Sequence, residues 1–146
     1  MSVSIRPLEE RDKQAWLPLW QGYLEFYETS VSDEVTEATW QRIVDPAGSI
    51  HGLGAFDAEG RLVGIVHYLF HPVTWATSDR CYLEDLFVSP AARGTGAGRA
   101  LIEAVYRAAD EVDADQVYWL TAHSNAMARQ LYDRVAQVTP FIKYRR

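Results

Sequence analysis

The sequence contains a single cysteine, Cys81, among its 146 residues. One cysteine cannot form an internal disulfide, and chains poor in disulfides are typical of reducing compartments. Cys81 opens an apolar segment, so we interpret it as a packed residue and not as a nucleophile. The first residues, MSVSIRPLEERDK, lack the apolar core of a signal peptide. We therefore expect a cytoplasmic protein.

Long apolar runs and an excess of basic residues are also absent. No run approaches the length that crosses a bilayer, so we expect no membrane partner. The 14 Lys and Arg residues are outnumbered by 20 Asp and Glu, which gives a net charge of −6. Because binding to nucleic acid needs a basic surface, we expect no nucleic-acid partner. The negative charge suits a cationic substrate, and it suits an ordinary solvated surface equally well.

A metal-binding pattern is missing too. The four histidines have no spacing typical of metal ligands, and no cysteine or carboxylate pattern stands beside them. We therefore expect no metal and interpret these residues as core or cleft-edge histidines: His51, His67, His71 and His123.

The residues that are present predict one α/β domain over 1–146 with a mixed sheet. A chain of 146 residues is long enough to bury a core of its own. Its composition, 48% hydrophobic and 23% charged, is that of an ordinary globular protein. Alternating apolar residues predict strands, and apolar residues at helical spacing predict helices; together they give the order βααβββαβαβ. A strand–helix–strand connection implies that the strands at 81–88 and 117–122 run parallel. The predicted elements include strands at 2–6, 51–58, 62–71, 81–88, 117–122 and 140–144, and helices at 33–44 and 125–135.

The first helix follows Pro7 and has an aromatic face of Trp16, Trp20, Tyr23 and Tyr27 at helical spacing. We interpret this face as core. Pro18 lies inside the pattern, so we expect a kink or a restart of the helix there.

A glycine-rich segment, Arg93-Gly94-Thr95-Gly96-Ala97-Gly98, joins the strand at 81–88 to an amphipathic helix. Glycines between a strand and a helix expose backbone N–H groups at the positive end of the helix dipole, where phosphate binds. A dinucleotide fingerprint would need glycine at Arg99, and the Gly-Lys-Ser/Thr ending of a P-loop is absent. The motif that remains is R-x-x-G-x-G.

This motif, with LEDLFVSP before it and NAMARQLYDRV after it, resembles the GNAT superfamily of acetyl-CoA-dependent N-acetyltransferases. The resemblance is specific from Tyr82 to about Tyr132. The LED strand looks most like the branch of diamine and polyamine acetyltransferases, and a related branch acetylates histones and free amino acids. The resemblance implies a mixed sheet with splayed parallel strands, flanked by helices.

The resemblance also implies acetyl-CoA as co-substrate, held where the strands part near a bulge after Glu84. The turn would bind the pyrophosphate, and strand N–H groups would bind the pantetheine arm and the thioester oxygen. The implied coenzyme-binding residues are Leu86, Phe87, Val88, Arg93, Gly94, Thr95, Gly96, Ala97, Gly98, Arg99 and Asn125. Asn125 can also serve as a helix N-cap.

Two adjacent carboxylates, Glu84 and Asp85, stand within the apolar strand. Buried carboxylates are costly unless paired or hydrated, so at least one is a functional candidate. Regular alternation would place Glu84 on the face of Leu86 and Asp85 on the face of Leu83. An alkylammonium group, with a pKa of about 10.4, must lose a proton before it attacks a thioester. The resemblance makes Glu84 the base, acting through water. Asp85 is either a structural partner or an amine-binding group.

The resemblance makes Tyr132 the general acid that protonates the departing thiolate, whereas the residues alone favour a packed aromatic. It also places the first helices over the acceptor, which makes Tyr23 and Tyr27 candidates for substrate binding. Many members of the family carry Gly-Phe soon after the tyrosine, but residues 133–141 contain no glycine. The last strands are therefore expected to be short or irregular.

These observations predict direct acetyl transfer to a primary amine of a small molecule, namely a polyamine, a diamine or an amino acid. Alternatives are a protein lysine or N-terminal amine as acceptor, a CoA-binding sensor without catalysis, and a partner-binding module. Homodimers are common in the family, and Trp75 and the apolar end of the chain favour one here.

Overall fold

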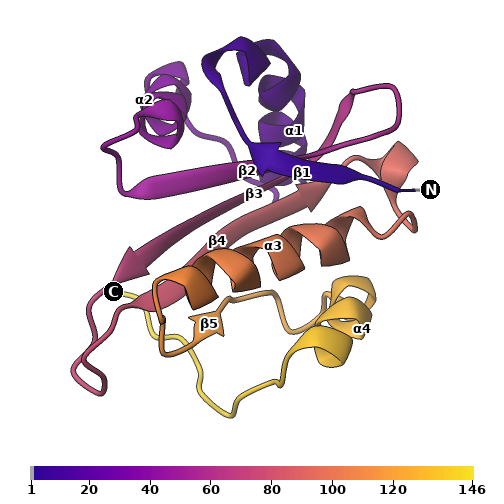
Figure 1. The fold of residues 1–146 in the computed structure, drawn as a ribbon. Coiled ribbons are helices and arrows are strands. Elements are labelled where there is room, and N and C mark those ends of the chain that lie inside the picture. Colours follow the sequence, from indigo (N-terminus) through magenta and orange to yellow (C-terminus); the bar gives the residue numbers. More distant parts are fainter. Residues whose placement is uncertain (1) are drawn as a thin grey trace.

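A computed structural model describes residues 2–146, with Met1 outside the described part. Five strands form one sheet in the order β1-β2-β3-β4-β5, with α1 and α2 over one face and α3 over the other (Figure 1). The mixed α/β prediction is confirmed. The elements are β1 (Ser4–Pro7), α1 (Lys13–Phe26), α2 (Asp33–Val44), β2 (Ile50–Phe56), β3 (Leu62–His71), β4 (Arg80–Val88), α3 (Ala97–Glu111), β5 (Val117–Tyr118) and α4 (Ala126–Val135).

The sheet is antiparallel from β1 to β4, and only β4 and β5 run parallel. A parallel pair needs a crossover, and α3 supplies it, as the sequence predicts. The predicted hairpin between β2 and β3 is also present. In its turn the Asp57 carboxylate accepts hydrogen bonds from the N–H groups of Glu59 and Arg61, and Gly60 has a φ of +79°.

Two apolar cores lie on the two faces of the sheet. The core under α3 contains Leu83, Leu101 and Ile102, and the core under α1 and α2 contains Trp16 and Trp40. Cys81 is fully buried in the first core, and burial raises the pKa of its thiol to about 11. A thiol that stays protonated at neutral pH is a poor nucleophile, as expected for a packing residue.

The structure differs from three predictions about the elements. Of the kink or restart predicted at Pro18, the restart is absent: α1 is one helix through Pro18, because Trp16 and Trp20 on either side of it are buried and hold the helix on the sheet. The strand predicted at 117–122 ends at Tyr118, since the next residue, Trp119, turns to pack against the rings of Tyr106 and Tyr132.

The segment predicted as a last strand, 140–144, pairs with no strand in the described part of the chain. Its large apolar side chains Phe141 and Ile142 are 84% and 74% exposed, so no burial supports an ordered strand there. Among residues 2–146, no helix is both long enough and apolar enough to cross a membrane.

The entry into α1 depends on a buried carboxylate, Asp12, which lies between β1 and α1. Asp12 accepts two hydrogen bonds from the Arg6 guanidinium, at 2.8 and 3.1 Å, and one from the N–H of Glu9 at 2.8 Å. The bonds from Arg6 hold the pKa of Asp12 below its usual value. This contact fixes the start of α1 on the sheet.

Replacing Asp12 with alanine should lower the free energy of unfolding by about 2 kcal/mol, since it removes charge-assisted bonds from a buried site. The folded pKa of Asp12 is depressed, so its contribution is present above 3.8, the ordinary pKa of the group, and is lost as pH falls through the lower folded value. Urea unfolding at neutral and acid pH measures both effects. Glu37→Gln is the control: its ion pair with Lys13 lies at the surface, where such pairs contribute little, so the free energy of unfolding should hardly change.

Candidate active site

The site is built around a β-bulge in β4. Asp85 pairs with His67 of β3, but the next pair along is Leu83 with Tyr68, so Glu84 has no partner residue. The extra residue reverses the direction of the side chains that follow it. Leu86 and Val88 therefore pack in the same core as Leu83, and Phe87 packs in the core under α1. The prediction from regular alternation, which put Asp85 on the face of Leu83, is wrong for this reason.

The bulge brings both carboxylates to the α1 side of the sheet. Asp85 is 15% exposed, and its Oδ2 lies 2.9 Å from Nδ1 of His67. Glu84 is accessible to solvent, and its charge still acts on the hydroxyl of Tyr23 in α1. The predicted residues Glu84, Asp85 and Tyr23 thus meet at one place.

Electrostatics at this place favour proton transfer by Glu84. Although the side chain is accessible to solvent, the protein atoms around its carboxyl group remove part of its hydration, which raises the pKa of Glu84, and the charge of Asp85 raises it further. The charge of Lys143 acts in the opposite direction. The pKa of Tyr23 is also raised, first by burial and then by the charge of Asp85. Tyr23 therefore remains a neutral hydrogen-bond donor next to the carboxylates.

His67 is a member of this cluster that the sequence interpretation did not assign. It is almost completely buried, and its Nε2 accepts a hydrogen bond of 3.1 Å from the indole N–H of Trp16. The sequence showed no carboxylate beside it, because Asp85 stands 18 positions away and only the strand register joins the two. No pattern of neighbouring residues in the sequence indicates that His67 and Asp85 are paired.

Tyr132 lies on α4 and packs against the core under α3. Its ring packs edge-on against Trp119, with the ring centroids 5.4 Å apart. Burial raises the pKa of Tyr132 to about 12, with a smaller effect from Tyr27, which places the two predicted tyrosines near each other. Asn125 directly precedes α4, but its side-chain amide donates to the hydroxyl of Thr121 at 3.1 Å and does not cap the helix.

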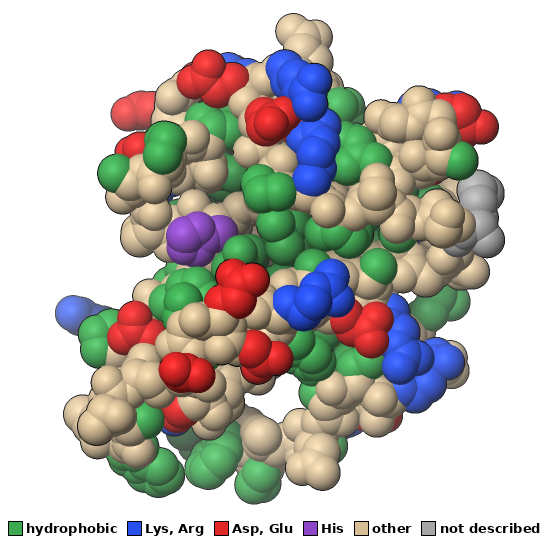
Figure 2. All heavy atoms as spheres, viewed as in Figure 1, with side chains coloured by type: hydrophobic (Ala, Val, Ile, Leu, Met, Phe, Trp, Pro, Cys, Tyr) green, Lys and Arg blue, Asp and Glu red, His purple; other side chains and the backbone are tan. Residues whose placement is uncertain are grey.

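An opening separates β4 from β5, as the splayed arrangement predicts. Their pairing ends at Tyr82 and Tyr118, so the following part of β4 has no strand on that side. The N–H of Ser89 bonds to Val63 of β3. Alternation then turns the N–H of Phe87 toward β3 and those of Leu86 and Val88 toward the opening. The surface is hollowed below α3, between β5 and α4 (Figure 2).

The glycine-rich turn lies between β4 and α3. Gly94 and Gly96 have φ values of +81° and +86°, which glycine adopts without strain, and a Cβ on either would meet nothing within 4 Å. The backbone here is therefore open to a ligand at the start of a 15-residue helix. A diphosphate fits such a site by charge and by hydrogen bonding.

The side chains of the turn have distinct environments. Arg93 donates from Nε to the carbonyl of Val88 at 3.2 Å, and its guanidinium lies 5.5 Å from the ring centre of Phe87. The hydroxyl of Thr95 donates to the carbonyl of Ala92. Ala97 is buried, so only its backbone is available to a coenzyme, and Arg99 pairs with Glu103 at 3.6 Å.

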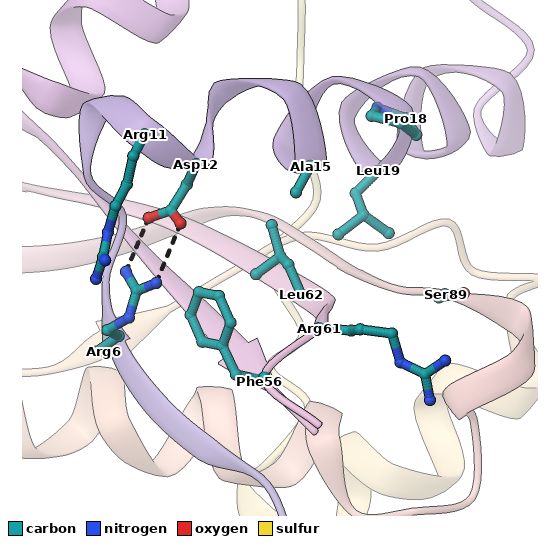
Figure 3. A pocket seen from close by; sticks show the side chains of 11 residues that line it. Arg6, Arg11, Asp12, Ala15, Pro18, Leu19, Phe56, Arg61, Leu62 and Ser89 are labelled. Atoms are coloured by element: carbon teal, nitrogen blue, oxygen red, sulfur yellow. Dashed lines mark hydrogen bonds and ion pairs between the residues drawn. The ribbon is translucent and has the colours of Figure 1, made fainter. Parts of the chain in front are cut away.

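Two surface cavities lie outside the carboxylate cluster. The larger, of about 570 Å³, is lined by arginines that are each paired with a carboxylate, as the bonds between Arg6 and Asp12 show (Figure 3). None of the predicted site residues lines it. The smaller, of about 420 Å³, reaches Phe87 and Arg93 and so borders the turn. In residues 2–146, no three His, Cys, Asp or Glu side chains are grouped as metal ligands.

Comparisons with known proteins agree with this geometry. A family model described as the acetyltransferase (GNAT) family matches residues 15–136. The chain is 40% identical over 145 residues to the D-amino-acid N-acetyltransferase HPA3 of Saccharomyces cerevisiae, covering 99% of this chain and 90% of that protein. It is 30% identical over 145 residues to YhfO of Bacillus subtilis, described as an uncharacterized N-acetyltransferase, covering 97% of this chain and 95% of that protein.

Solved structures share the fold. A complex of the aminoglycoside N-acetyltransferase AAC(6')-Iy with a CoA bisubstrate analogue superposes with a TM-score of 0.84 at 20% identity, covering 100% of this chain and 98% of that one. A ribosomal-protein-alanine N-acetyltransferase from Brucella melitensis gives 0.80 at 22% identity, covering 99% and 97%. With its family model, its curated relatives and its fold in agreement, this chain belongs to the GNAT family of acetyltransferases.

Proposed function

We propose that this enzyme transfers an acetyl group from acetyl-CoA to a primary amine of a small molecule. The observation that carries the proposal is the pair of carboxylates, Glu84 and Asp85, which the bulge presents beside the opening between β4 and β5. An ammonium group is attracted to two adjacent negative charges. The neighbouring Tyr23 and Tyr27 give the acceptor site an aromatic wall.

Among small amines, we favour a free amino acid over a diamine or a polyamine. The yeast relative is named a D-amino-acid N-acetyltransferase, and its similarity extends over almost the whole chain. The charge of Lys143 also acts on Glu84, so a cation lies near the proposed amine site. A cation there suits the carboxylate of an amino acid and opposes the second ammonium of a diamine.

The proposed mechanism is direct attack in a ternary complex. Acetyl-CoA supplies the activated acetyl group as a thioester, with its diphosphate on residues 93–98. Asp85 binds the acceptor ammonium, and Glu84 accepts its proton through a water molecule. The N–H groups of Leu86 and Val88 stabilise the oxygen that becomes negative in the transition state.

Tyr132 completes the mechanism as the donor to the departing sulfur. With a pKa of about 12 its phenol is protonated at neutral pH, so it can donate a proton and cannot accept one. A free thiol has a pKa of about 8.5, so the departing thiolate is a weaker base than the phenolate of Tyr132. Tyr132 therefore stabilises the departing thiolate mainly by a hydrogen bond while the carbon–sulfur bond breaks, and the thiolate takes its proton from solvent after it leaves.

We propose in addition that the enzyme is a cytoplasmic homodimer. The single cysteine is consistent with a reducing compartment. The large apolar side chains of Trp75, Phe141 and Tyr144 are exposed, and such residues are enriched where two chains meet.

A panel of acceptors tests the acetyl-transfer proposal. Thiol release from acetyl-CoA would be followed with D- and L-amino acids, putrescine, spermidine and a lysine-containing peptide. We expect turnover with the amino acids above that with the peptide. Binding of acetyl-CoA without thiol release for any amine would instead indicate a sensor, and failure to bind it would indicate a partner-binding module.

Replacing Glu84 with glutamine should reduce kcat/KM by about 100-fold at neutral pH, a typical effect of removing a general base. The raised pKa of Glu84 places the acid side of the wild-type pH profile above 4.5, the ordinary value, because the base must be ionised. This limb should be absent from the variant. Steady-state kinetics from pH 4 to 9 measure it, and a variant with the wild-type profile would contradict the role.

Replacing Tyr132 with phenylalanine should lower kcat by about tenfold or more and leave the affinity for acetyl-CoA unchanged, since the ring and its packing on Trp119 remain. Calorimetry and single-turnover kinetics separate the two quantities. Tyr106→Phe is the matched control, because the Tyr106 hydroxyl bonds to the carbonyl of Val135. If both variants lost the same activity, Tyr132 would have no special role.

Replacing Gly96 with alanine should cost about 1–2 kcal/mol of stability because of its positive φ, and should weaken binding of acetyl-CoA about tenfold. Gly98→Ala is the stability control, because a Cβ there would make an ordinary contact of 3.4 Å with Leu131. Thermal unfolding and titration calorimetry provide the two measurements. Wild-type affinity in Gly96→Ala would argue against a diphosphate at this turn.

A further inference from the structure

His67 is a buried histidine for which the proposed mechanism has no use. It is 1% exposed and lies on β3 beside two stacked tryptophans of α1, with ring centroids 6.0 Å from Trp16 and 5.8 Å from Trp20. Both of its ring nitrogens are hydrogen-bonded, one to Trp16 and one to Asp85. His67 contacts Asp85, the carboxylate proposed to bind the substrate, and both of its ring nitrogens are engaged. These contacts indicate that His67 has a role in the site.

We propose that His67 is a positioning residue that fixes the Asp85 carboxylate for the ammonium group of the acceptor. The inference rests on the proposed function and deepens it, because it assigns amine binding to a three-residue unit, Trp16–His67–Asp85. It makes Asp85 the anchor of the amine and leaves proton removal to Glu84.

The protonation of the ring follows from its two partners. An indole N–H can only donate, so Nε2 of His67 must be the unprotonated, accepting nitrogen. The proton of the neutral ring is therefore on Nδ1, which donates to Oδ2 of Asp85. Trp16 thus selects the one neutral form of His67 that supports an ionised Asp85.

The same contacts exclude proton transfer through His67. A shuttle would have to take a proton on one nitrogen and release one from the other, but the nitrogen on the far side faces a donor. The ring is also enclosed: a Cβ on Gly52 of β2 would lie 3.6 Å from its Cδ2. A proton taken from the acceptor has no path through this ring, so His67 acts by its geometry and by the hydrogen bond that it donates to Asp85.

Because His67 holds one oxygen of Asp85, the carboxylate that would bind the amine is fixed in position. Oδ2 of Asp85 is committed to His67, and the bond to a neutral ring leaves the full negative charge on the carboxylate. Asp85 can then present its other oxygen to an ammonium group next to Tyr23 without the loss of side-chain freedom that binding would otherwise require.

Two amide substitutions at His67 separate its two contacts. Asparagine places an amide near the position of Nδ1 and can still donate to Asp85, but it cannot reach Trp16. Glutamine places an amide near Nε2 and can accept from Trp16, but it loses the bond to Asp85. The two variants are matched in chemistry and differ in the contact they keep.

We expect His67→Gln to raise KM for the fastest amine of the panel by about tenfold relative to His67→Asn, with KM for acetyl-CoA equal in the two variants. The acid limb of the pH profile should be the same in both, because Glu84 is untouched. Equal amine KM values in the two variants, or an acetyl-CoA KM that rises in parallel, would overturn the inference. Thermal unfolding of both variants shows whether they are folded.

A measurement on the unaltered enzyme keeps the test independent of activity and of the folding of the variants. Nitrogen-15 NMR of the histidine rings should show His67 with a proton on Nδ1 and none on Nε2, and the same form after an amino acid is added. A proton on Nε2 would refute the arrangement whether or not the enzyme turns over. If the NMR result is as expected but no amine of the panel reacts, the proposed function is wrong, whereas the hydrogen-bonded arrangement of Trp16, His67 and Asp85 is supported.

Discussion

One unpaired residue in β4 determines the arrangement of the site. Glu84 has no partner on β3, and this bulge reverses the faces on which the rest of the strand packs. Without it, Asp85 would face the apolar core under α3, where an ionised carboxylate is costly. With it, Asp85 meets His67 and Tyr23 on the α1 side, next to Glu84.

The same strand also carries backbone groups that are proposed to bind the coenzyme. Beyond Tyr82 it parts from β5, which leaves the N–H groups of Leu86 and Val88 facing an opening, and it then runs into the turn of Gly94 and Gly96. A single continuous segment therefore carries the proposed amine-binding carboxylate, the proposed base and the proposed diphosphate site. In the proposed mechanism this continuity sets the distance between the two substrates, which is what direct transfer requires.

Features that depend on neighbouring residues were predictable from the sequence. The glycine turn, the hairpin at Asp57 and the parallel pair of β4 and β5 each follow from a local pattern together with general rules of connection. The resemblance to the GNAT family added Glu84 and Tyr132, which the residues alone do not distinguish from packed or surface side chains.

Features that depend on register or tertiary packing were not predictable. The face of Asp85 depends on an extra residue whose effect appears only against β3, and the partner of His67 depends on the same register. The end of β5 depends on the packing of Trp119 against Tyr106 and Tyr132, and residues 140–144 are exposed and pair with no strand in the described chain.

The most direct test of this account is a crystal structure with CoA and an amino-acid acceptor bound together. The account predicts the diphosphate on the amides of residues 93–98 and the acceptor nitrogen within hydrogen-bonding distance of Asp85, with Glu84 reachable through one water. An acceptor nitrogen bound away from both carboxylates, with CoA in place, would contradict it.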